Sequence, residues 1–517
     1  MNILLNKLNK GVSLHYIQKC AKLFLFCTFL YVVKNTKSQT FDFNENYQQA
    51  YLQASRMKLV EAKKITSIER SKNSENLAYT LVDNYTDLVN LVIYTDENFY
   101  KTFISNSVSR INSVEKLSND NPWRAAVLSE LYFHKASARL IYSENIKAAF
   151  DIRKAATNIN YNKKIHLSFT YNYKLSSLLN LAFGSIPESM KWAASLLSMK
   201  GDVETGLKES AYFLNHTKNN EDFRCFYPEA LCLRLTLINM FDPNTRKTNT
   251  PRHLIKEAQN HNEIYKNQLL LFTVADYQMR NNMNDEAIKL LLNAKFDSSY
   301  AKLENLNYLT GIALQNKLDD RAILYFQKYV QNKANKNYVK ASWQRIAWHY
   351  LLKNNVEKYY ENIKQVLVYG NSITESDQSA LVEAKSLSIP NKHILATQLL
   401  FDGGYYKQAL SEIKKANYSK LKLEEKAEYN YRLARIYDEV NNTPKAIEHY
   451  NLVVEQASDK PWFFAANSLL MIGLHYEEIG EKEMAKANYK NCLKLNPNRY
   501  KTSIHQKAKA GLNRLKQ

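Results

Sequence analysis

The sequence predicts an all-α protein in which helix pairs stack into an elongated α-solenoid. The first observation is the scarcity of turn residues, since only 11 Gly and 9 Pro occur in 517 residues. The second is apolar spacing at the helical period, with no hairpin dipeptide between alternating apolar runs. The third is a helix-pair pattern that occurs twice in succession between Ala427 and Pro497. A chain of this length exceeds what one compact core usually organises, which implies either several domains or an elongated repeat array.

The two copies of the pattern are offset by 39 residues: Leu433, Ala434, Tyr437, Ala446 and Tyr450 match Ile472, Gly473, Tyr476, Ala485 and Tyr489. In each copy a large residue, a small residue and an aromatic residue share one face of a first helix. The small residue, Ala434 or Gly473, lets a second helix approach closely. One such pair cannot bury its apolar face alone, so neighbouring pairs are expected to stack.

The second copy resembles the tetratricopeptide repeat (TPR) through Leu469, Ile472, Gly473, Tyr476, Ala485, Tyr489 and Pro497. The resemblance is to TPR proteins of an exported bacterial type. It implies a right-handed superhelix that binds another macromolecule, and it implies nothing about chemistry at a site.

Residues 1–39 have the composition of a signal peptide. They contain six lysines and no acidic residue, and Leu23–Val33 form a short apolar core. A membrane-spanning helix needs roughly 20 apolar residues, so the segment predicts export to the periplasm or outer membrane, with cleavage near Ser38. An uncleaved signal anchor is the alternative, and an association with the membrane or envelope is compatible with both. Lipidation of Cys27 is not expected, because a bulky residue precedes it and the apolar core continues beyond it.

Residues 40–230 are predicted to form an irregular N-terminal helical domain, with amphipathic helices over 44–65, 77–93, 123–140 and 146–157. Farther along, turns bracket a short apolar helix, Met190–Met199, as in a packed elbow; the turn residues are Gly184, Pro187, Gly201 and Gly206. This stretch resembles a eukaryotic TPR-like family associated with the mitochondrial outer membrane and with clearance of protein inclusions. The resemblance brings no catalytic residue.

Residues 231–517 are predicted to form the TPR-like repeat domain. The second helices of successive pairs are marked by Ala287, Ala322, Tyr359, Ala409 and Ala446. Their spacing keeps a period close to that of the repeat. Tyr359 stands where a small residue is expected, and residues 367–391 interrupt the array.

Charge and cysteine content indicate which class of partner and which cross-links to expect. Without the predicted leader the chain has 65 basic and 50 acidic residues, but the lysines are scattered and no compact basic block with interleaved aromatics occurs. We therefore expect no nucleic-acid partner. Cys225, Cys232 and Cys492 are too few for a disulfide framework and are interpreted as buried thiols, although a bridge between the first two stays open.

No enzyme motif is present: a zinc-protease helix, paired Cys-x-x-Cys, a phosphate loop and Gly-x-Ser-x-Gly are all absent. The nearest metal-like pairs are Glu130 with His134 and His475 with Glu478. Two ligands do not make a zinc site, so both are interpreted as solvated or core-edge pairs on helices. We expect no catalytic residue, no cofactor, no metal and no small-molecule substrate.

The predicted function is that of an exported scaffold or adaptor that binds a protein or peptide through its concave face. In TPR proteins the first helix of each pair lines that face. The resemblance implies that eight side chains of these first helices project inward, beside the packing residues, where they would bind a partner: Gln344, Trp348, Tyr431, Arg435, Asp438, Asn467, Leu474 and Glu477. A mixture of aromatic and charged groups suits a polypeptide. Most of the 36 tyrosines are interpreted as packing residues.

Two other functions remain open. One is a surface or periplasmic glycan-binding helical-repeat protein, although neither a lipobox nor a Trp-rich insertion is visible. The other is an α-helical enzyme with dispersed acidic residues, which we expect to show as carboxyl groups with perturbed pKa values in one cleft.

Overall fold

The computed structural model describes residues 39–94, 96–184, 200–241, 250–260, 263–386 and 388–515. The predicted leader, except for its last residue, and the predicted helix Met190–Met199 lie outside these ranges. Within them, the only β structure is an isolated parallel bridge between Thr40 and Asn76. No helix in the described ranges is long and apolar enough to span a bilayer. The all-α prediction is confirmed.

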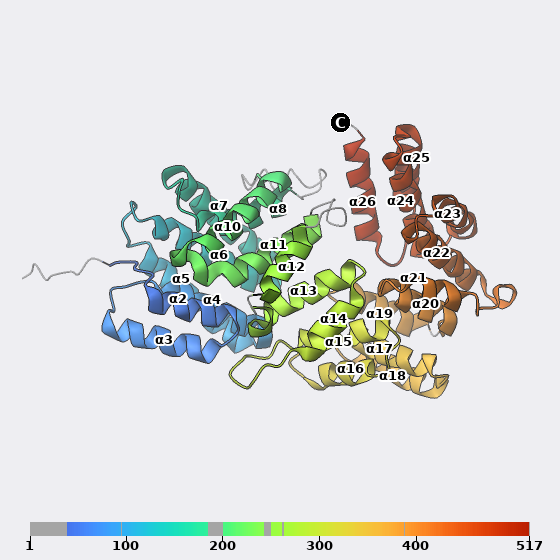
Figure 1. Cartoon of the computed structure of the whole chain (residues 1–517), viewed down its shortest axis with the longest axis horizontal. Helices are drawn as coiled ribbons and strands as arrows, with labels where there is room; N and C mark the ends of the chain where they lie inside the picture. Colours follow the sequence, from blue (N-terminus) through green and yellow to red (C-terminus); the bar gives the residue numbers. More distant parts are fainter. Residues whose placement is uncertain are drawn as a thin grey trace, which may run out of the picture.

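The N-terminal half, blue to green in Figure 1, consists of α2 (Glu45–Ser55), α3 (Leu59–Lys72), α4 (Tyr79–Tyr94), α5 (Glu97–Val114), α6 (Pro122–Ile141), α7 (Asn145–Ile165), α8 (Asn172–Gly184), α10 (Val203–Asn219), α11 (Tyr227–Phe241) and α12 (Thr250–Asn260). The predicted helices over 77–93 and 123–140 are confirmed as α4 and α6. The predicted single helix over 44–65 is wrong, because Met57 adopts a φ of 67° and turns the chain between α2 and α3. The helix predicted over 146–157 continues to Ile165.

The C-terminal half, yellow to red in Figure 1, contains the pairs α13 (Gln268–Arg280) with α14 (Asn284–Asn293), α15 (Asn305–Asn316) with α16 (Ala322–Gln331), α17 (Val339–Leu352) with α18 (Val356–Val368), α20 (Lys392–Asp402) with α21 (Tyr406–Ile413), α22 (Leu423–Glu439) with α23 (Thr443–Ala457) and α24 (Phe463–Glu478) with α25 (Lys482–Lys494). α19 (Glu375–Ser386) lies in the predicted interruption and packs on α17 and α18, and α26 (Lys501–Arg514) packs on α24 and α25. The fold is an α-solenoid of helix pairs.

Every one of these pairs turns at a single residue in the left-handed region: Asn282, Leu318, Asn354, Gly404, Asn441 and Gly480. The next residue donates its N–H to the carbonyl five positions earlier, as Glu481 does to Tyr476 and Asn442 to Tyr437. This geometry ends the first helix and satisfies its last carbonyl groups. Two N-terminal hairpins turn in the same way, at Met57 and Ser143. The repeat is therefore built into the backbone as well as the packing.

The predicted close approach of paired helices is confirmed at the glycine positions. A Cβ added to Gly473 would lie 2.6 Å from Tyr489 Cε1, and one added to Gly311 would lie 2.7 Å from Phe326 Cε1. Both aromatic rings are buried. Glycine is thus required for the second helix to reach its position against the first.

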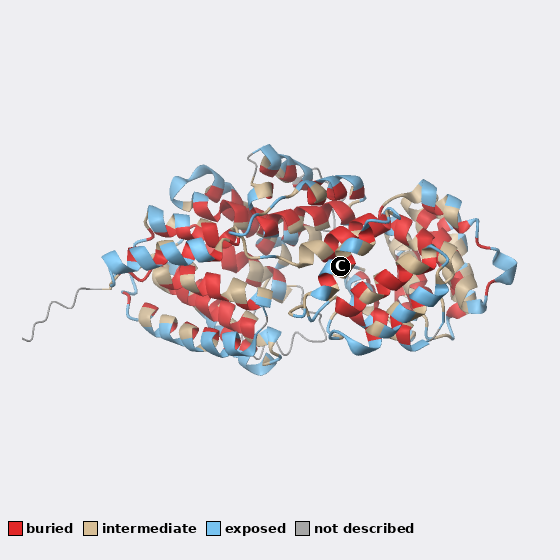
Figure 2. Cartoon of the chain, turned by 90° about the horizontal axis from the view of Figure 1, so that it is seen from below, coloured by how far each residue is buried: buried red, intermediate tan, exposed pale blue. Residues whose placement is uncertain are grey.

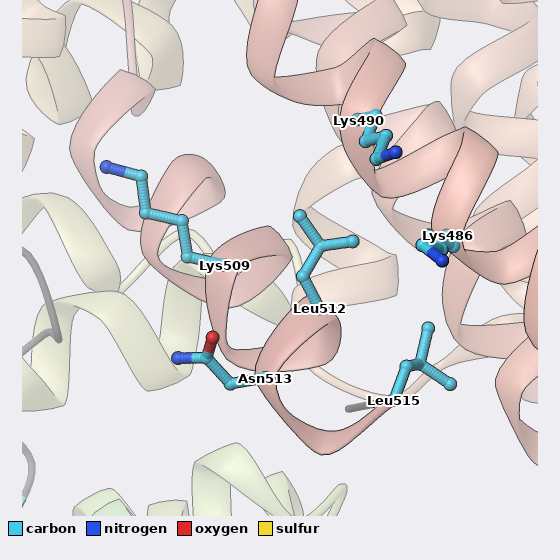
Figure 3. Close-up of a pocket in the computed structure, with 6 residues that line it drawn as sticks. All are labelled: Lys486, Lys490, Lys509, Leu512, Asn513 and Leu515. Carbon is cyan, nitrogen blue, oxygen red and sulfur yellow. The ribbon is translucent and has the colours of Figure 1, made fainter. Parts of the chain in front are cut away.

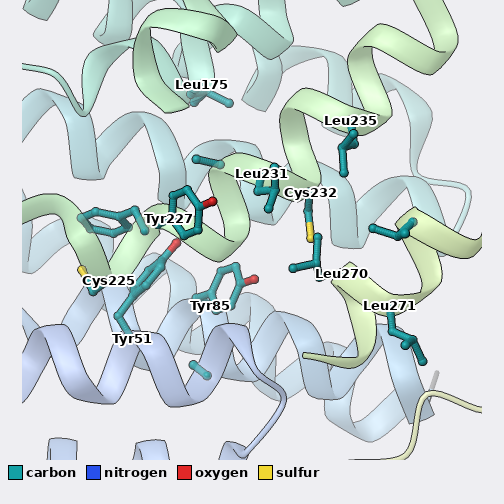
Figure 4. Packing of buried hydrophobic residues seen from close by; sticks show 14 of the residues in the cluster. Tyr51, Tyr85, Leu175, Cys225, Tyr227, Leu231, Cys232, Leu235, Leu270 and Leu271 are labelled. Atoms are coloured by element: carbon teal, nitrogen blue, oxygen red, sulfur yellow. The ribbon is translucent and has the colours of Figure 1, made fainter. Parts of the chain in front are cut away.

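Buried residues line the interior of both halves of the chain, as the red segments in Figure 2 show. One buried cluster runs from Phe41 to Ile346 and crosses the predicted domain boundary at position 230, and a separate cluster spans Ala427–Ala508. The division at 230 stays a prediction. In Figure 4, side chains of α2, α4, α8, α11 and α13 meet around Tyr51 and Tyr85.

The described ends of the predicted elbow pack tightly, because Cβ atoms added to Gly201 and Gly206 would lie 2.5 Å from Asn180 O and 2.6 Å from Leu181 Cγ. The three described cysteines are free and buried, as predicted. Burial raises the pKa of the Cys225 and Cys232 thiols, which keeps them protonated and unreactive.

Candidate binding surface on the inner face of the C-terminal repeats

Two of the predicted site residues, Gln344 and Trp348 on α17, are held by a carboxylate from α19. Gln344 Nε2 donates to Glu383 Oε2 at 2.5 Å, and Trp348 Nε1 donates to Glu383 Oε1 at 2.9 Å. The Tyr359 hydroxyl adds a third donor at 3.0 Å. Burial raises the pKa of Glu383, although the three donors oppose the rise. The interrupting helix thus supplies the acceptor for the hydroxyl of the buried Tyr359.

α19 is also fixed at its start. Asp377 accepts the backbone N–H groups of Tyr338 and Ala341 at 2.7 and 3.0 Å and so caps the N-terminus of α17. The Thr374 hydroxyl donates to the same carboxylate at 2.7 Å. Helix α19 is therefore anchored to α17 at both ends.

Tyr431, on α22, is a core residue. Its side chain is 2 % exposed and packs against Phe463 and Phe464, with ring centroids 5.6 and 5.4 Å away. Its hydroxyl accepts hydrogen bonds from Arg435 Nη1 at 3.1 Å and from Asn467 Nδ2 on α24. This hydroxyl ties two successive first helices together.

The remaining predicted residues bridge neighbouring helices. Asp438 accepts the Tyr450 hydroxyl at 3.2 Å and lies 3.0 Å from His475 Nε2. Glu477 binds Arg514 of α26 with two hydrogen bonds, at 2.6 and 2.8 Å, and also accepts the hydroxyl of Tyr489. Leu474 packs against the C-terminal buried cluster.

The expectation that all eight side chains project freely inward is wrong for Gln344, Trp348 and Tyr431, which are 5 %, 7 % and 2 % exposed. The reason is packing by neighbouring helices: Glu383 of α19 binds Gln344 and Trp348, and aromatic rings of α24 pack against Tyr431. Whether any of the eight residues binds a partner stays a prediction.

A polar cluster that the sequence predicted only through Arg435 lies where α17, α20 and α22 meet. Arg345 on α17 and Arg432 and Arg435 on α22 all act electrostatically on Asp402, the last residue of α20. Asp402 is exposed, but the surrounding protein desolvates its carboxyl group and raises its pKa against the pull of the three arginines. The cluster therefore brings three arginines to one exposed acidic residue where three helices meet.

The three arginines differ in their partners. Arg432 binds Glu428 at 2.7 Å and Gln398 at 2.7 Å. Arg435 lies 4.8 Å from the ring centroid of Phe401 and bonds only to a tyrosine hydroxyl. Arg345 lies 5.2 Å from the ring of Trp348 and donates to an amide oxygen. Among the described residues neither Arg345 nor Arg435 has a carboxylate within salt-bridge distance. Arg345 directly follows Gln344 in the sequence, so its position in the repeat could have identified it as a candidate site residue.

A small pocket of about 220 Å³ between α15, α17, α20 and α21 bears on the enzyme alternative. His393 Nδ1 lies 2.7 Å from Glu412 Oε1, and His349 lines the same pocket with its pKa lowered by burial. No serine, threonine or cysteine lines this pocket, so it holds no hydroxyl or thiol nucleophile for the histidine pair. The carboxyl groups with raised pKa values on α4, α19 and α20 do not line it either.

A second polar group, in the N-terminal half, is buried apart from Glu229, which is partly exposed. Lys174 Nζ lies 2.7 Å from the Tyr51 hydroxyl, 3.0 Å from Glu229 and 3.3 Å from Glu130, and His134 Nε2 lies 3.2 Å from Glu130. Burial alone would raise the pKa of Glu130, but Lys174 and His134 lower it to about 2. The interpretation of Glu130 and His134 as a solvated or core-edge pair is wrong, because both side chains are buried and contact Lys174 of α8 and Asn84 of α4. The group is a structural ion network.

No group of three or more metal-ligating side chains occurs in the part of the chain that the structure describes. His475, predicted to pair with Glu478, is held instead by Asp438, whose hydrogen bond raises the pKa of the imidazole.

Comparisons with known proteins add little. No protein-family model matches the chain, and no curated protein matches it. Among solved structures, the chain is similar to the TPR domain of P58(IPK), at 13 % identity with a TM-score of 0.20, covering 84 % of this chain and 99 % of that one. A TM-score this low carries no argument, so the fold rests on the helix pairs described above.

Proposed function

We propose that this chain is a non-enzymatic scaffold, exported to the cell envelope, that binds a protein or peptide partner through the concave face of its C-terminal repeats. The observation that carries the proposal is the pair Arg345 and Arg435. Both arginines are half-buried and lie on first helices of the repeats, and their direct partners are rings and neutral oxygens.

A half-buried guanidinium loses hydration, and an ion pair normally offsets that loss. Here the offset is incomplete, because the nearest acid, Asp402, is shared among three arginines. A carboxylate from a partner would bind such a guanidinium with two parallel hydrogen bonds. Asp402 would accept N–H groups from the same partner. The cluster of Asp402 and the three arginines therefore favours a polypeptide segment that carries an acidic side chain next to free backbone amides.

The test is a crosslinking pull-down from the native envelope with the double variant Arg345→Gln, Arg435→Gln. Partners recovered by the wild-type protein should be lost or reduced at least tenfold. The matched control removes two positive charges from exposed turns of the same half, Arg321→Gln with Lys353→Gln, and should recover the partners unchanged. Circular dichroism should show that both variants keep their helices. Equal recovery by all three proteins would sink the proposal.

Export is supported by the composition of residues 1–39, with a lysine-rich start and a short apolar core. Mass spectrometry of the mature protein should find an amino terminus near Gln39. An intact Met1 in a cytosolic fraction would contradict export.

A further inference from the structure

A groove of about 500 Å³ lies between α25 and α26, away from the arginine cluster and sharing no residue with it. Its walls are three lysines and an asparagine, and its apolar part is two leucines: Lys486, Lys490, Lys509, Asn513, Leu512 and Leu515. Figure 3 shows Leu512 on α26 pointing toward α25, where Lys486 and Lys490 stand. The groove therefore combines an apolar floor with a cationic rim.

The position of the groove follows from the repeat. In each pair from α13 to α25, the second helix packs along the first. Helix α26 takes the place of a first helix, since it contacts both α24 and α25, and Tyr489 of α25 fits between Gly473 and Gly511. Among the described helices none packs on α26 as a second helix. The groove beside α25 is where such a helix would lie, because a solenoid continues by adding helices in this way.

The charge around the groove is predominantly positive. Residues 482–515 contain nine lysines and arginines and one acidic residue, Glu483, a net charge of +8. Lys486 lies 3.5 Å from Glu483, a largely exposed carboxylate. Neither Lys490 nor Lys509 forms a salt bridge with any described residue. These lysines repel one another, and an acidic ligand would relieve the repulsion.

We propose that this groove docks an amphipathic helix of a partner protein that presents leucine-like side chains to Leu512 and Leu515 and acidic side chains to the lysines. A helix fits because it would complete the pair that α26 begins and because grooves of this kind recognise i, i+3 and i+4 anchors. A flat bilayer surface cannot enter a concave site between two helices. Nucleic acid is disfavoured because no aromatic side chain lines the groove for base stacking. The site goes beyond the proposed concave-face function and does not depend on it.

The probe is a fluorescein-labelled synthetic peptide of 14 residues, the length of α26, with leucines on one helical face and glutamates flanking them. Fluorescence anisotropy should show saturable binding to the full chain. A peptide of the same composition in scrambled order, which has no apolar face, should bind at least tenfold more weakly. Equal binding of the two peptides, or of vesicles containing anionic phospholipid, would overturn the proposal, since charge alone would then explain it.

The decisive variant reverses the three rim charges: Lys486→Glu, Lys490→Glu and Lys509→Glu. It should weaken binding of the ordered peptide at least tenfold. The matched control reverses three exposed lysines of the same two helices that do not line the groove: Lys482→Glu, Lys494→Glu and Lys507→Glu.

The control variant should bind the ordered peptide within a factor of about three of wild type, since only screened long-range charge changes. An equal loss in both variants would refute a defined site. Leu512→Ser, which changes no charge, provides a second readout and should also weaken binding. Because the arginine variants leave this groove intact, failure here and failure of the concave-face proposal are separate results.

Discussion

Replacing Gly473 by alanine should destabilise the C-terminal repeats, although alanine is the better helix former. The added Cβ would lie 2.6 Å from Tyr489 Cε1 and 2.7 Å from Cδ1. The ring cannot retreat, because a Cβ on Gly511 would lie only 2.4 Å from its other edge, so the backbone of α26 stands close behind it. The Tyr489 hydroxyl is also held by Glu477. The helices α24, α25 and α26 would therefore have to separate.

The magnitude follows from two opposing terms. Overpacking a well-filled core costs about 1–3 kcal/mol, and the upper part of that range applies because both sides of the ring are blocked. Exchanging glycine for alanine inside a helix returns about 1 kcal/mol. The net expectation is a loss of about 1–2 kcal/mol for Gly473→Ala. Gly473→Leu should cost more, because the larger side chain cannot fit without displacing α25.

A double-mutant cycle with Tyr489→Leu measures the clash directly. In the Tyr489→Leu background the space beside Gly473 opens, so Gly473→Ala should become neutral or stabilising, and the coupling between the two substitutions should be about 2 kcal/mol. Urea denaturation followed by circular dichroism gives the free energies, and hydrogen exchange locates the change in α24–α26. Additive effects within about 0.5 kcal/mol would refute the reasoning.

Three further predictions test other regions. Lys174→Met should destabilise the N-terminal half by about 3–5 kcal/mol in urea denaturation, because Glu130 and Glu229 would lose their buried cation; a loss below about 1 kcal/mol would contradict the network. Tyr431→Ala should likewise cost about 3–5 kcal/mol by calorimetry, since it empties a buried site, whereas an unchanged melting temperature would show an exposed residue. Burial raises the pKa of Asp83 from 3.8 to about 6. The neutral carboxyl group is tolerated in the folded state, so the free energy of unfolding is highest below about pH 4 and falls as pH rises through 6. Asp83→Asn should therefore gain roughly 2 kcal/mol over wild type between pH 4 and pH 7, and a pH-independent difference would refute the assignment.

The helix pairs of the C-terminal half could be predicted because their signals are local. Gly473 and Ala485 indicate a close contact between two helices, and Tyr489 is the aromatic side chain that packs between them. Each signal lies within a few helical turns of its partner, so periodicity and residue size are sufficient to find it. The split between α2 and α3 could not be found in this way, because Met57 is not a residue type that marks a left-handed turn.

The placement of the candidate site residues depended on tertiary structure. Repeat register put Gln344, Trp348 and Tyr431 on inner helices, and they do lie there. Register does not tell which other helix packs on a side chain, and here Glu383 of the inserted helix α19 binds the first two and Phe464 of α24 packs on the third. A side chain that points inward is then buried instead of free.

By itself, the sequence determined that the chain is helical, that its helices form pairs, and that glycine marks close contacts such as those at Gly311 and Gly473, because these features depend on neighbours in the chain. Only the tertiary structure decided which charges have partners. Arg435 meets a phenylalanine ring from α20, and Lys490 of α25 and Lys509 of α26 line one groove without a salt-bridge partner among the described residues. Electrostatic pairing acts over distances in space that sequence spacing does not encode, so the open cationic sites appear only once the helices are stacked.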